Sequence, residues 1–208
     1  MNGKQLKNSI LQWAIQGKLV SQDPNDEPAS VLLERIRAEK AKLVKEKKIK
    51  KDKNESIIYR GDDNSYYEKF IATGEVKCID EEIPFEIPSS WEWCRMQDIM
   101  KFVNGRAYKK EELLSRGKYK VLRVGNFFTN NEWYYSDLEL PDDKYCYPGD
   151  LLYAWSASFG PQIWNDVKTI FHYHIWNVKY NSRILLRDYL FYFFLYCLLY
   201  TSDAADEL

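Results

Sequence analysis

The sequence predicts an α+β protein in which two helices precede a unit built mainly of antiparallel β-strands. Apolar residues recur at helical spacing near the N-terminus, and short apolar runs alternate with turn signals from about residue 83 onward. Aromatic residues make up 16% of the chain, which favours sheet and stacking surfaces. The hydrophobic content of 45% is sufficient for a packed core and excludes a wholly disordered chain.

Residues 1–56 are predicted to form a helical segment. The first helix carries an apolar stripe and is expected to stop at Gly17. The second is expected to run from Ala29 to about Lys51, with Asp26 as N-cap and Pro28 in the first turn. Its narrow apolar stripe fits either a helix–helix seam or a helix packed on its own domain.

Residues 57–82 are interpreted as a hairpin and linker, with two short strands around a Gly-Asp-Asp-Asn turn. Residues 83–196 are predicted to form the β-rich domain. Pro84 and Pro88 force extended backbone before them, and the alternation from Trp91 to Arg95 predicts a strand, followed by a helical turn at 97–102. Further strands are expected at 119–124, 132–135, 150–155, 163–164 and 170–178, and a packing helix at 183–195.

Charge is unevenly distributed along the chain. The 30 basic and 31 acidic residues nearly cancel, but residues 1–56 and 101–130 are basic while the remainder is acidic. This pattern excludes a uniformly basic DNA-coating protein and allows local basic patches. The four cysteines are widely spaced without a CxxC pair, which predicts a reduced, cytoplasmic protein without zinc. Arg187 and Asp188 interrupt the one long apolar run, so no membrane span is expected.

Motifs for catalysis are missing from the sequence. There is no P-loop, GxGxxG, GxSxG or HExxH pattern. Asp166 and Lys168 form a fragment of a nuclease pattern, which keeps a standalone metal-dependent nuclease as an alternative. His172 and His174 would share one face of a strand, but no third metal ligand lies nearby; a contact to a DNA base edge or a hydrogen-bonded sheet histidine fits them better. A helix-mediated interaction protein is a further alternative, resting on residues 29–51.

The remaining signal is for recognition of nucleic acid. Arginine and asparagine can read base edges, lysine neutralises phosphate, and aromatic rings can stack or wedge. Residues of these kinds, together with a serine pair at a turn, gather around flexible glycine turns in the basic stretch and beyond it. The candidate DNA-binding residues are Arg106, Tyr108, Lys109, Lys110, Lys118, Lys120, Arg123, Asn126, Trp155, Ser156, Ser158 and Phe159.

The chain resembles the specificity subunit of type I restriction-modification systems. The segments that carry the resemblance are LKNSILQWAIQGKLVSQDPNDEPASVLLERIRAEKAKLVKEKKIKK, IPFEIPSSWEWCRMQDI, KVLRVGN, YPGDLLYAWSASFGPQIW, FHYHIW and DYLFYFFL. The resemblance implies a curled, mostly antiparallel target recognition domain with a flanking helix, in a sequence-specific DNA-binding subunit without catalytic chemistry of its own. The implied partners are double-stranded DNA, methyltransferase subunits that dock on the helices, and a motor-nuclease subunit. S-adenosylmethionine, ATP and Mg²⁺ would belong to those partners, and this chain would hold no cofactor.

The resemblance also implies a longer protein, of which this chain would be the N-terminal part with a single recognition domain. In the ending CLLYTSDAADEL, the residues CLLYTSDAAD match the translation of a nucleotide string that resembles a transposase-based sequencing adapter. We therefore expect residues 197–208 to be a non-native tail on a truncated fragment.

Overall fold

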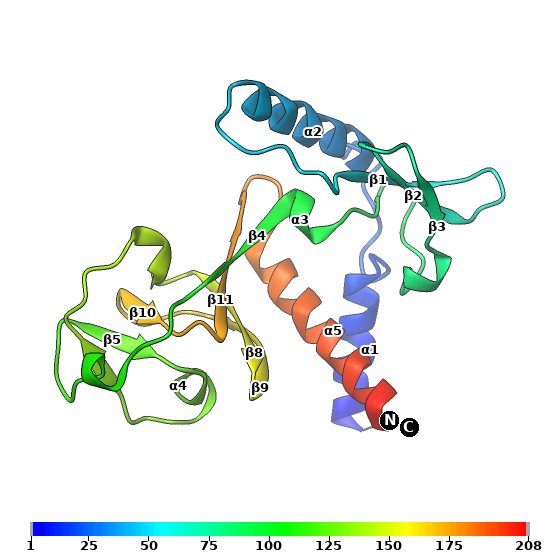
Figure 1. The fold of residues 1–208 in the computed structure, drawn as a ribbon. Helices are drawn as coiled ribbons and strands as arrows, with labels where there is room; N and C mark the ends of the chain where they lie inside the picture. The colour runs from blue at the N-terminus through cyan, green and yellow to red at the C-terminus, as the bar shows by residue number, and fades with distance from the viewer. Residues whose placement is uncertain (1, 207–208) are drawn as a thin grey trace. The chain divides into compact units, whose positions relative to one another are not determined.

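A computed structural model describes residues 2–206 of the chain. The chain divides into two compact units between Ile99 and Met100 (Figure 1). The sequence-based division placed residues 83–99 with the β-rich domain, whereas in the structure they belong to the first unit.

The first unit begins with helices α1 (Gly3–Ile15) and α2 (Ala29–Lys45). Asn2 and Gln5 form a capping box at the start of α1, and the helix ends before Gly17, as predicted. The cap prediction for α2 was wrong: Pro28 precedes its first turn without any side-chain cap. The predicted end at Lys51 was also wrong, because Lys47 adopts a positive φ of 58° and the backbone N–H of Lys48 returns to the Leu43 carbonyl.

A three-stranded antiparallel sheet follows, in the order β1 (Ser56–Arg60), β2 (Tyr66–Phe70) and β3 (Val76–Cys78). The predicted hairpin is confirmed, since β1 pairs with β2 around the turn from Gly61 to Ser65. The sequence missed β3, which pairs with β2.

The predicted strand from Trp91 to Arg95 was wrong, because these residues have no regular secondary structure and no ladder partner. Their alternating side chains instead contact separate parts of the first unit. The Trp91 indole N–H donates to Gln22 Oε1 (2.8 Å), and Arg95 forms ion pairs with Glu68 and Glu82. The one-turn helix η1 (Asp80–Glu82) supplies Glu82. The helical turn predicted at 97–102 is observed as α3 (Met96–Ile99), which ends three residues earlier because the next strand begins at Met100.

The second unit contains two four-stranded sheets, with strand orders β4-β11-β8-β9 and β6-β5-β10-β7. All of their pairings are antiparallel except β5 with β10, so the predicted α+β, mostly antiparallel architecture is confirmed. The strands are β4 (Met100–Asn104), β5 (Tyr119–Leu122), β6 (Tyr134–Ser136), β7 (Tyr145–Cys146), β8 (Leu151–Ser156), β9 (Ser158–Ile163), β10 (Thr169–Phe171) and β11 (Ile175–Tyr180). Short helices α4 (Val124–Phe128), η2 (Lys110–Glu112) and η3 (Asp142–Lys144) lie in the connections.

Two differences from the predicted strands matter for the site. The single strand expected at 170–178 is split by a turn at Tyr173 and His174, closed by the Ile175 N–H bonding to the His172 carbonyl (3.0 Å). The strand expected at Ile163 and Trp164 begins instead at Ser158 and forms a tight hairpin with β8.

Side chains from both sheets form a shared buried cluster, and a second cluster lies around Val121 and Ile170. Helix α5 (Arg187–Asp206) follows β11 in the chain. Its Phe194 ring lies 5.3 Å from the ring of Tyr153, which alternates along β8 with the core residues Leu152 and Ala154. The helix begins four residues later than predicted, after a turn closed on Asn181. The expectation that residues 197–208 are non-native stays a prediction. Within residues 2–206, we find no helix long and apolar enough to cross a membrane.

Candidate nucleic-acid interface

The parallel pairing of β5 with β10 brings three chain segments together at one end of the second unit. Because parallel strands end at the same edge, Arg123 after β5 and His172 after β10 lie beside each other, and the His172 N–H donates to the Leu122 carbonyl (2.9 Å). On the other side, Arg106 forms a parallel bridge with His172. Its backbone N–H donates to the Phe171 carbonyl (3.1 Å) and its carbonyl accepts from the Tyr173 N–H (3.1 Å).

The β8–β9 hairpin adds a fourth segment. Its strands reverse at a single residue, Ala157, which has a φ of 64°, and Ser156 faces Ser158 across the turn. The Trp155 backbone N–H donates to the His174 carbonyl (3.1 Å), and its indole N–H donates to the Tyr173 carbonyl (3.1 Å). We call the resulting surface the aromatic edge and define it as Arg106, Tyr108, Arg123, Trp155–Phe159 and His172–His174.

Positive charge borders the aromatic edge. The Arg106 guanidinium is held by both oxygens of Glu112 (2.8 and 3.0 Å), whereas the Arg123 guanidinium lies 5.4 Å from the centre of the Tyr134 ring. Lys109 and Lys110 are exposed and precede Glu112 in sequence. In the part of the chain that the structure describes, no ion pair is formed by Arg123, Lys109 or Lys110. These three cations can therefore accept an external anion.

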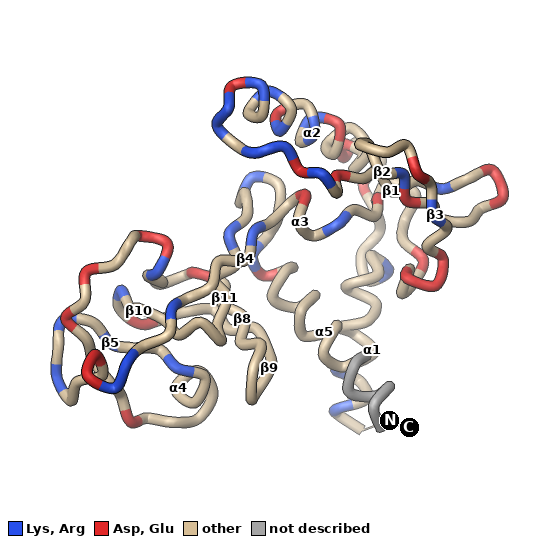
Figure 2. Tube along the Cα trace, viewed as in Figure 1, with Lys and Arg blue, Asp and Glu red and all other residues tan. Residues whose placement is uncertain are grey.

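The β8–β9 hairpin itself is uncharged. Residues 151–165 contain neither acidic nor basic side chains, and Figure 2 shows the β8 and β9 strands without blue or red. An uncharged tip beside cations is the arrangement expected where phosphates are held at the border and bases at the centre.

Burial also sets the ionisation of the central groups. Burial, and to a smaller extent the nearby His174 and Arg123, lower the pKa of His172 to about 4, so the imidazole is neutral at pH 7. A neutral imidazole has one N–H donor and one nitrogen acceptor. Burial raises the pKa of the Tyr108 phenol, which donates to the Phe171 carbonyl (3.3 Å).

The structure brings most, but not all, of the predicted DNA-binding residues to this edge. Arg106, Tyr108, Arg123, Trp155, Ser156, Ser158 and Phe159 belong to it, and Lys109 and Lys110 border it. Lys118 and Lys120 do not: their ammonium groups pair with Glu139 and Asp166, and Lys118 lies five residues before Arg123, about 17 Å along an extended strand. Asn126 uses its amide N–H groups on the carbonyls of Asn130 (3.1 Å) and Glu132 (2.6 Å), which ties down the loop after α4.

His172, Tyr173 and His174 also lie at this edge but are not among the predicted DNA-binding residues, although a base-edge contact was one of the two roles that the sequence favoured for the histidines. The rings of His172 and His174 are 4.8 Å apart, and Trp155 packs edge-on to His174 at 5.2 Å. Their adjacency to the Trp155 hairpin depends on the turn that splits β10 from β11. The available signal was the dense run FHYHIW, which holds both histidines of the chain.

The residues of the nuclease fragment have structural partners. Asp166 accepts from the Lys120 ammonium (2.5 Å), which lowers the pKa of the carboxyl, and the Lys168 ammonium lies 3.9 Å from the centre of the Tyr145 ring. Among the described residues, no three His, Cys, Asp or Glu side chains lie together as a metal site would require.

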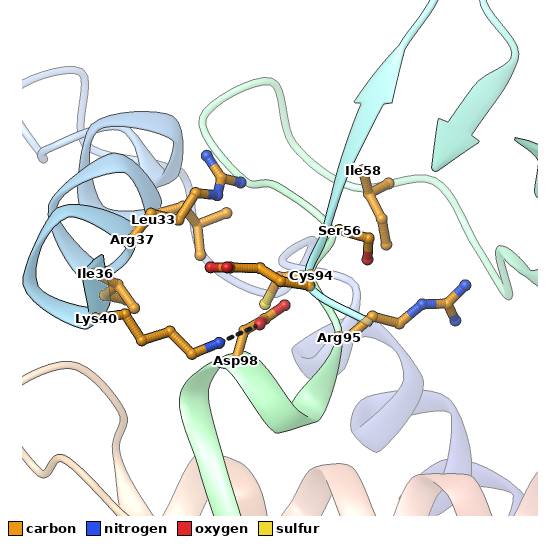
Figure 3. A pocket seen from close by; sticks show the side chains of 10 residues that line it. Leu33, Ile36, Arg37, Lys40, Ser56, Ile58, Cys94, Arg95 and Asp98 are labelled. Carbon is orange, nitrogen blue, oxygen red and sulfur yellow. Dashed lines mark hydrogen bonds and ion pairs between the residues drawn. The ribbon is translucent and has the colours of Figure 1, made fainter. Parts of the chain in front are cut away.

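A small hollow in the first unit explains the apolar stripe of α2. Leu33 and Ile36 of α2 line it, and the Lys40 ammonium spans it to Asp98 of α3 at 2.9 Å (Figure 3). Burial raises the pKa of the Cys94 thiol in its wall to about 11, so that thiol stays protonated. This part of the stripe packs within its own unit, one of the two uses that the sequence allowed.

Comparison with known proteins identifies the family. A family model described as the type I restriction modification DNA specificity domain matches residues 88–204. The type I restriction enzyme EcoAI specificity subunit of Escherichia coli is 50% identical over 121 residues, which cover 58% of this chain and 17% of that protein. The EcoEI specificity subunit of Escherichia coli is 48% identical over 95 residues, which cover 46% of this chain and 13% of that protein. The aligned parts thus span less than a fifth of these curated relatives.

Two solved structures are also similar to this chain. One is titled as the crystal structure of the HsdS subunit from Thermoanaerobacter tengcongensis, with a TM-score of 0.45, 16% identity, and coverage of 54% of this chain and 29% of that one. The other comes from work on complex assembly and conformational transition of the type I R-M system, with a TM-score of 0.46, 17% identity, and coverage of 55% and 29%. Because the family model spans more than half of its residues, the chain belongs to the family of type I restriction-modification DNA specificity domains.

Proposed function

We propose that this chain is the DNA-recognition part of a type I restriction-modification specificity subunit. In this proposal it binds double-stranded DNA at a defined sequence and directs methylation and restriction by partner subunits, without catalysing either reaction. The observation that carries the proposal is the aromatic edge, where an uncharged hairpin occurs together with Arg123, Lys109 and Lys110, which form no ion pair among the described residues.

The aromatic edge contains two kinds of group that would bind DNA: cations for the phosphates and hydrogen-bonding side chains for the base edges. Arg123, Lys109 and Lys110 would neutralise phosphates, which supplies affinity without sequence information. The Ser156 and Ser158 hydroxyls can donate or accept a hydrogen bond at a base edge, and the neutral His172 imidazole, whose Nδ1 accepts from the His174 N–H (3.4 Å), can donate from Nε2. Sequence preference would therefore come from the hairpin and the 172–174 turn.

The remaining parts of the assembly are proposed from the family. The relatives are named as specificity subunits of restriction enzymes. Methyltransferase subunits, docking on the N-terminal helices, and a motor-nuclease subunit would carry the chemistry together with S-adenosylmethionine, ATP and Mg²⁺. The protein would act in the cytoplasm, where its DNA lies.

The salt dependence of DNA binding tests this proposal. Binding to a labelled duplex of about 30 base pairs is followed by fluorescence anisotropy from about 50 to about 200 mM KCl. We expect the wild-type chain to bind with a steep log–log slope. The triple variant Lys109→Ala/Lys110→Ala/Arg123→Ala should lose up to about 2.7 from that slope, since each neutralised phosphate contributes roughly 0.9.

A matched control removes the same charge from the first unit. Lys42, Lys45 and Lys50 are exposed and form no ion pair among the described residues, so the triple alanine variant at these positions should keep the wild-type slope. Absence of duplex binding by the wild-type chain, or an equal loss of slope in both triple variants, would contradict the proposal.

A further inference from the structure

The tip of the β8–β9 hairpin presents one large apolar side chain to solvent. Phe159 is 59% exposed, and it faces Trp155 across the strand pair, so both rings project from the same face of the sheet. Its neighbours Ala157 and Ser158 are also exposed, and no charged residue occurs in the hairpin. Phe159 thus stands forward on the edge that we propose meets DNA.

The base of the hairpin is held firmly. The Trp155 ring stacks on Trp176 at 5.7 Å with an interplanar angle of 28°, and its indole N–H is bonded to the Tyr173 carbonyl. Gly160, next to Phe159, has a φ of 144°, a conformation that favours glycine, and a Cβ at this position would lie 3.9 Å from the Phe128 ring. Phe159 therefore projects from a hairpin whose base is held by the packing and hydrogen bonding of Trp155.

A phenyl ring cannot form hydrogen bonds with base edges or compensate phosphate charge. An exposed aromatic or aliphatic side chain on a protein surface that holds phosphates on either side can instead insert between base pairs and unstack one step. Arg106 and Arg123 approach His172 from its two sides, and the hairpin that carries Phe159 is bonded through Trp155 to the adjoining Tyr173 and His174 carbonyls, so cations and the exposed ring belong to the same edge.

We propose that Phe159 is a wedge that inserts at one base step of bound duplex DNA and kinks or unstacks it. This inference rests on the proposed DNA binding and adds a mechanism to it: the recognised sequence is read partly through the ease with which one step is opened.

The test compares two duplexes of about 24 base pairs that differ only by one unpaired central adenine. Part of the unstacking cost is absent in the bulged duplex, so a wedge protein should bind it more tightly, by about tenfold if about 1.4 kcal/mol of that cost is removed. Phe159→Ala should bring the two affinities to within about twofold. Phe159→Leu should retain most of the preference, because leucine is itself a common wedge residue.

Val167 provides the matched control, because it is an equally exposed apolar residue (58%) of the same unit that lies outside the aromatic edge. Val167→Ala should keep the preference for the bulged duplex, and circular dichroism checks that all variants fold. A fluorescent 2-aminopurine placed at successive positions of the perfect duplex should brighten at one step with wild-type protein and stay quenched with Phe159→Ala.

The outcomes separate the inference from the function on which it rests. Equal affinity of the wild-type chain for both duplexes, or a bulge preference that Phe159→Ala leaves intact, overturns the wedge while duplex binding and its salt slope stand. A preference that follows thymine content, with no 2-aminopurine response, assigns Phe159 to a methyl contact and also overturns the wedge. Failure of the wild-type chain to bind either duplex overturns the proposed function itself.

Discussion

The ion pair between Arg106 and Glu112 makes a specific prediction for DNA binding. Glu112 is the acidic side chain that holds a guanidinium of the aromatic edge, and it also accepts the Lys109 backbone N–H (2.8 Å). Glu112→Gln removes the negative charge but keeps a carbonyl oxygen for Lys109. The substitution should therefore free Arg106 for a phosphate without unfolding the η2 turn.

The expected size of the effect follows from the number of phosphates contacted. One additional neutralised phosphate steepens the log–log salt slope by roughly 0.9, so the gain in affinity over wild type should shrink about threefold between about 50 and about 200 mM KCl. The bonds from Lys109 and Arg106 lower the pKa of the Glu112 carboxyl, so Glu112 remains ionised near pH 7 and the effect should be flat across neutral pH.

The assay is anisotropy titration of a labelled duplex at several salt concentrations, with wild type, Glu112→Gln and Glu139→Gln measured in parallel. Glu139→Gln is the matched control, because Glu139 pairs with Lys118 away from the aromatic edge. An unchanged or shallower slope for Glu112→Gln, or equal steepening in both variants, would refute the assignment of Arg106 to the DNA-facing surface.

Three further predictions concern stability and ionisation. Arg95→Ala should destabilise the first unit by about 3–5 kcal/mol in urea titrations, because it leaves the Glu68 carboxylate (5% exposed) buried without its ion-pair partner. The double variant Glu68→Met/Arg95→Met should recover most of this lost stability. An Arg95→Ala chain of wild-type stability would contradict the account. Gly105→Ala should cost more than about 3 kcal/mol in thermal unfolding, since its Cβ would fall 2.0 Å from the Phe171 carbonyl oxygen; an unshifted Tm would disprove the close approach. The His172 ring should titrate near pH 4 by NMR, whereas in the unfolded chain the same ring takes up a proton near pH 6.5. The free energy of unfolding should therefore fall as the pH drops from 6.5 to 4. An NMR midpoint near 6.5, or a His172→Gln variant with the same pH dependence of stability, would contradict this prediction.

Local sequence signals predicted the elements whose structure depends on neighbouring residues. The apolar spacing before Gly17 predicted α1, and the Gly-Asp-Asp-Asn turn predicted the pairing of β1 with β2. The secondary-structure predictions were wrong where contacts between residues distant in sequence determine the conformation. Trp91 to Arg95 alternate as a strand does, yet these side chains bond to Gln22, Glu68 and Glu82 rather than to a neighbouring strand.

The candidate site shows the same division. The sequence predicted Arg106, Arg123 and Trp155 as DNA-binding residues, because basic and aromatic side chains have the chemistry that binds phosphates and bases. Which of the cations share one surface depends on the parallel pairing of β5 with β10, which alternation along a strand does not encode. That pairing places Arg123 beside His172 and leaves Lys118 at the far end of β5, paired with Glu139.

Sequence-specific binding of double-stranded DNA is the central claim, and selection from a randomised duplex pool tests it most directly. The full chain is used to enrich duplexes at about 150 mM salt, and the affinity of the enriched sequence is compared with that of single-base-pair variants. The account predicts a short enriched motif in which each wrong base pair costs about 1–3 kcal/mol, with the discrimination lost on changing the Trp155–Phe159 hairpin or His172. A pool without an enriched motif, bound as tightly as the selected duplex, would contradict it.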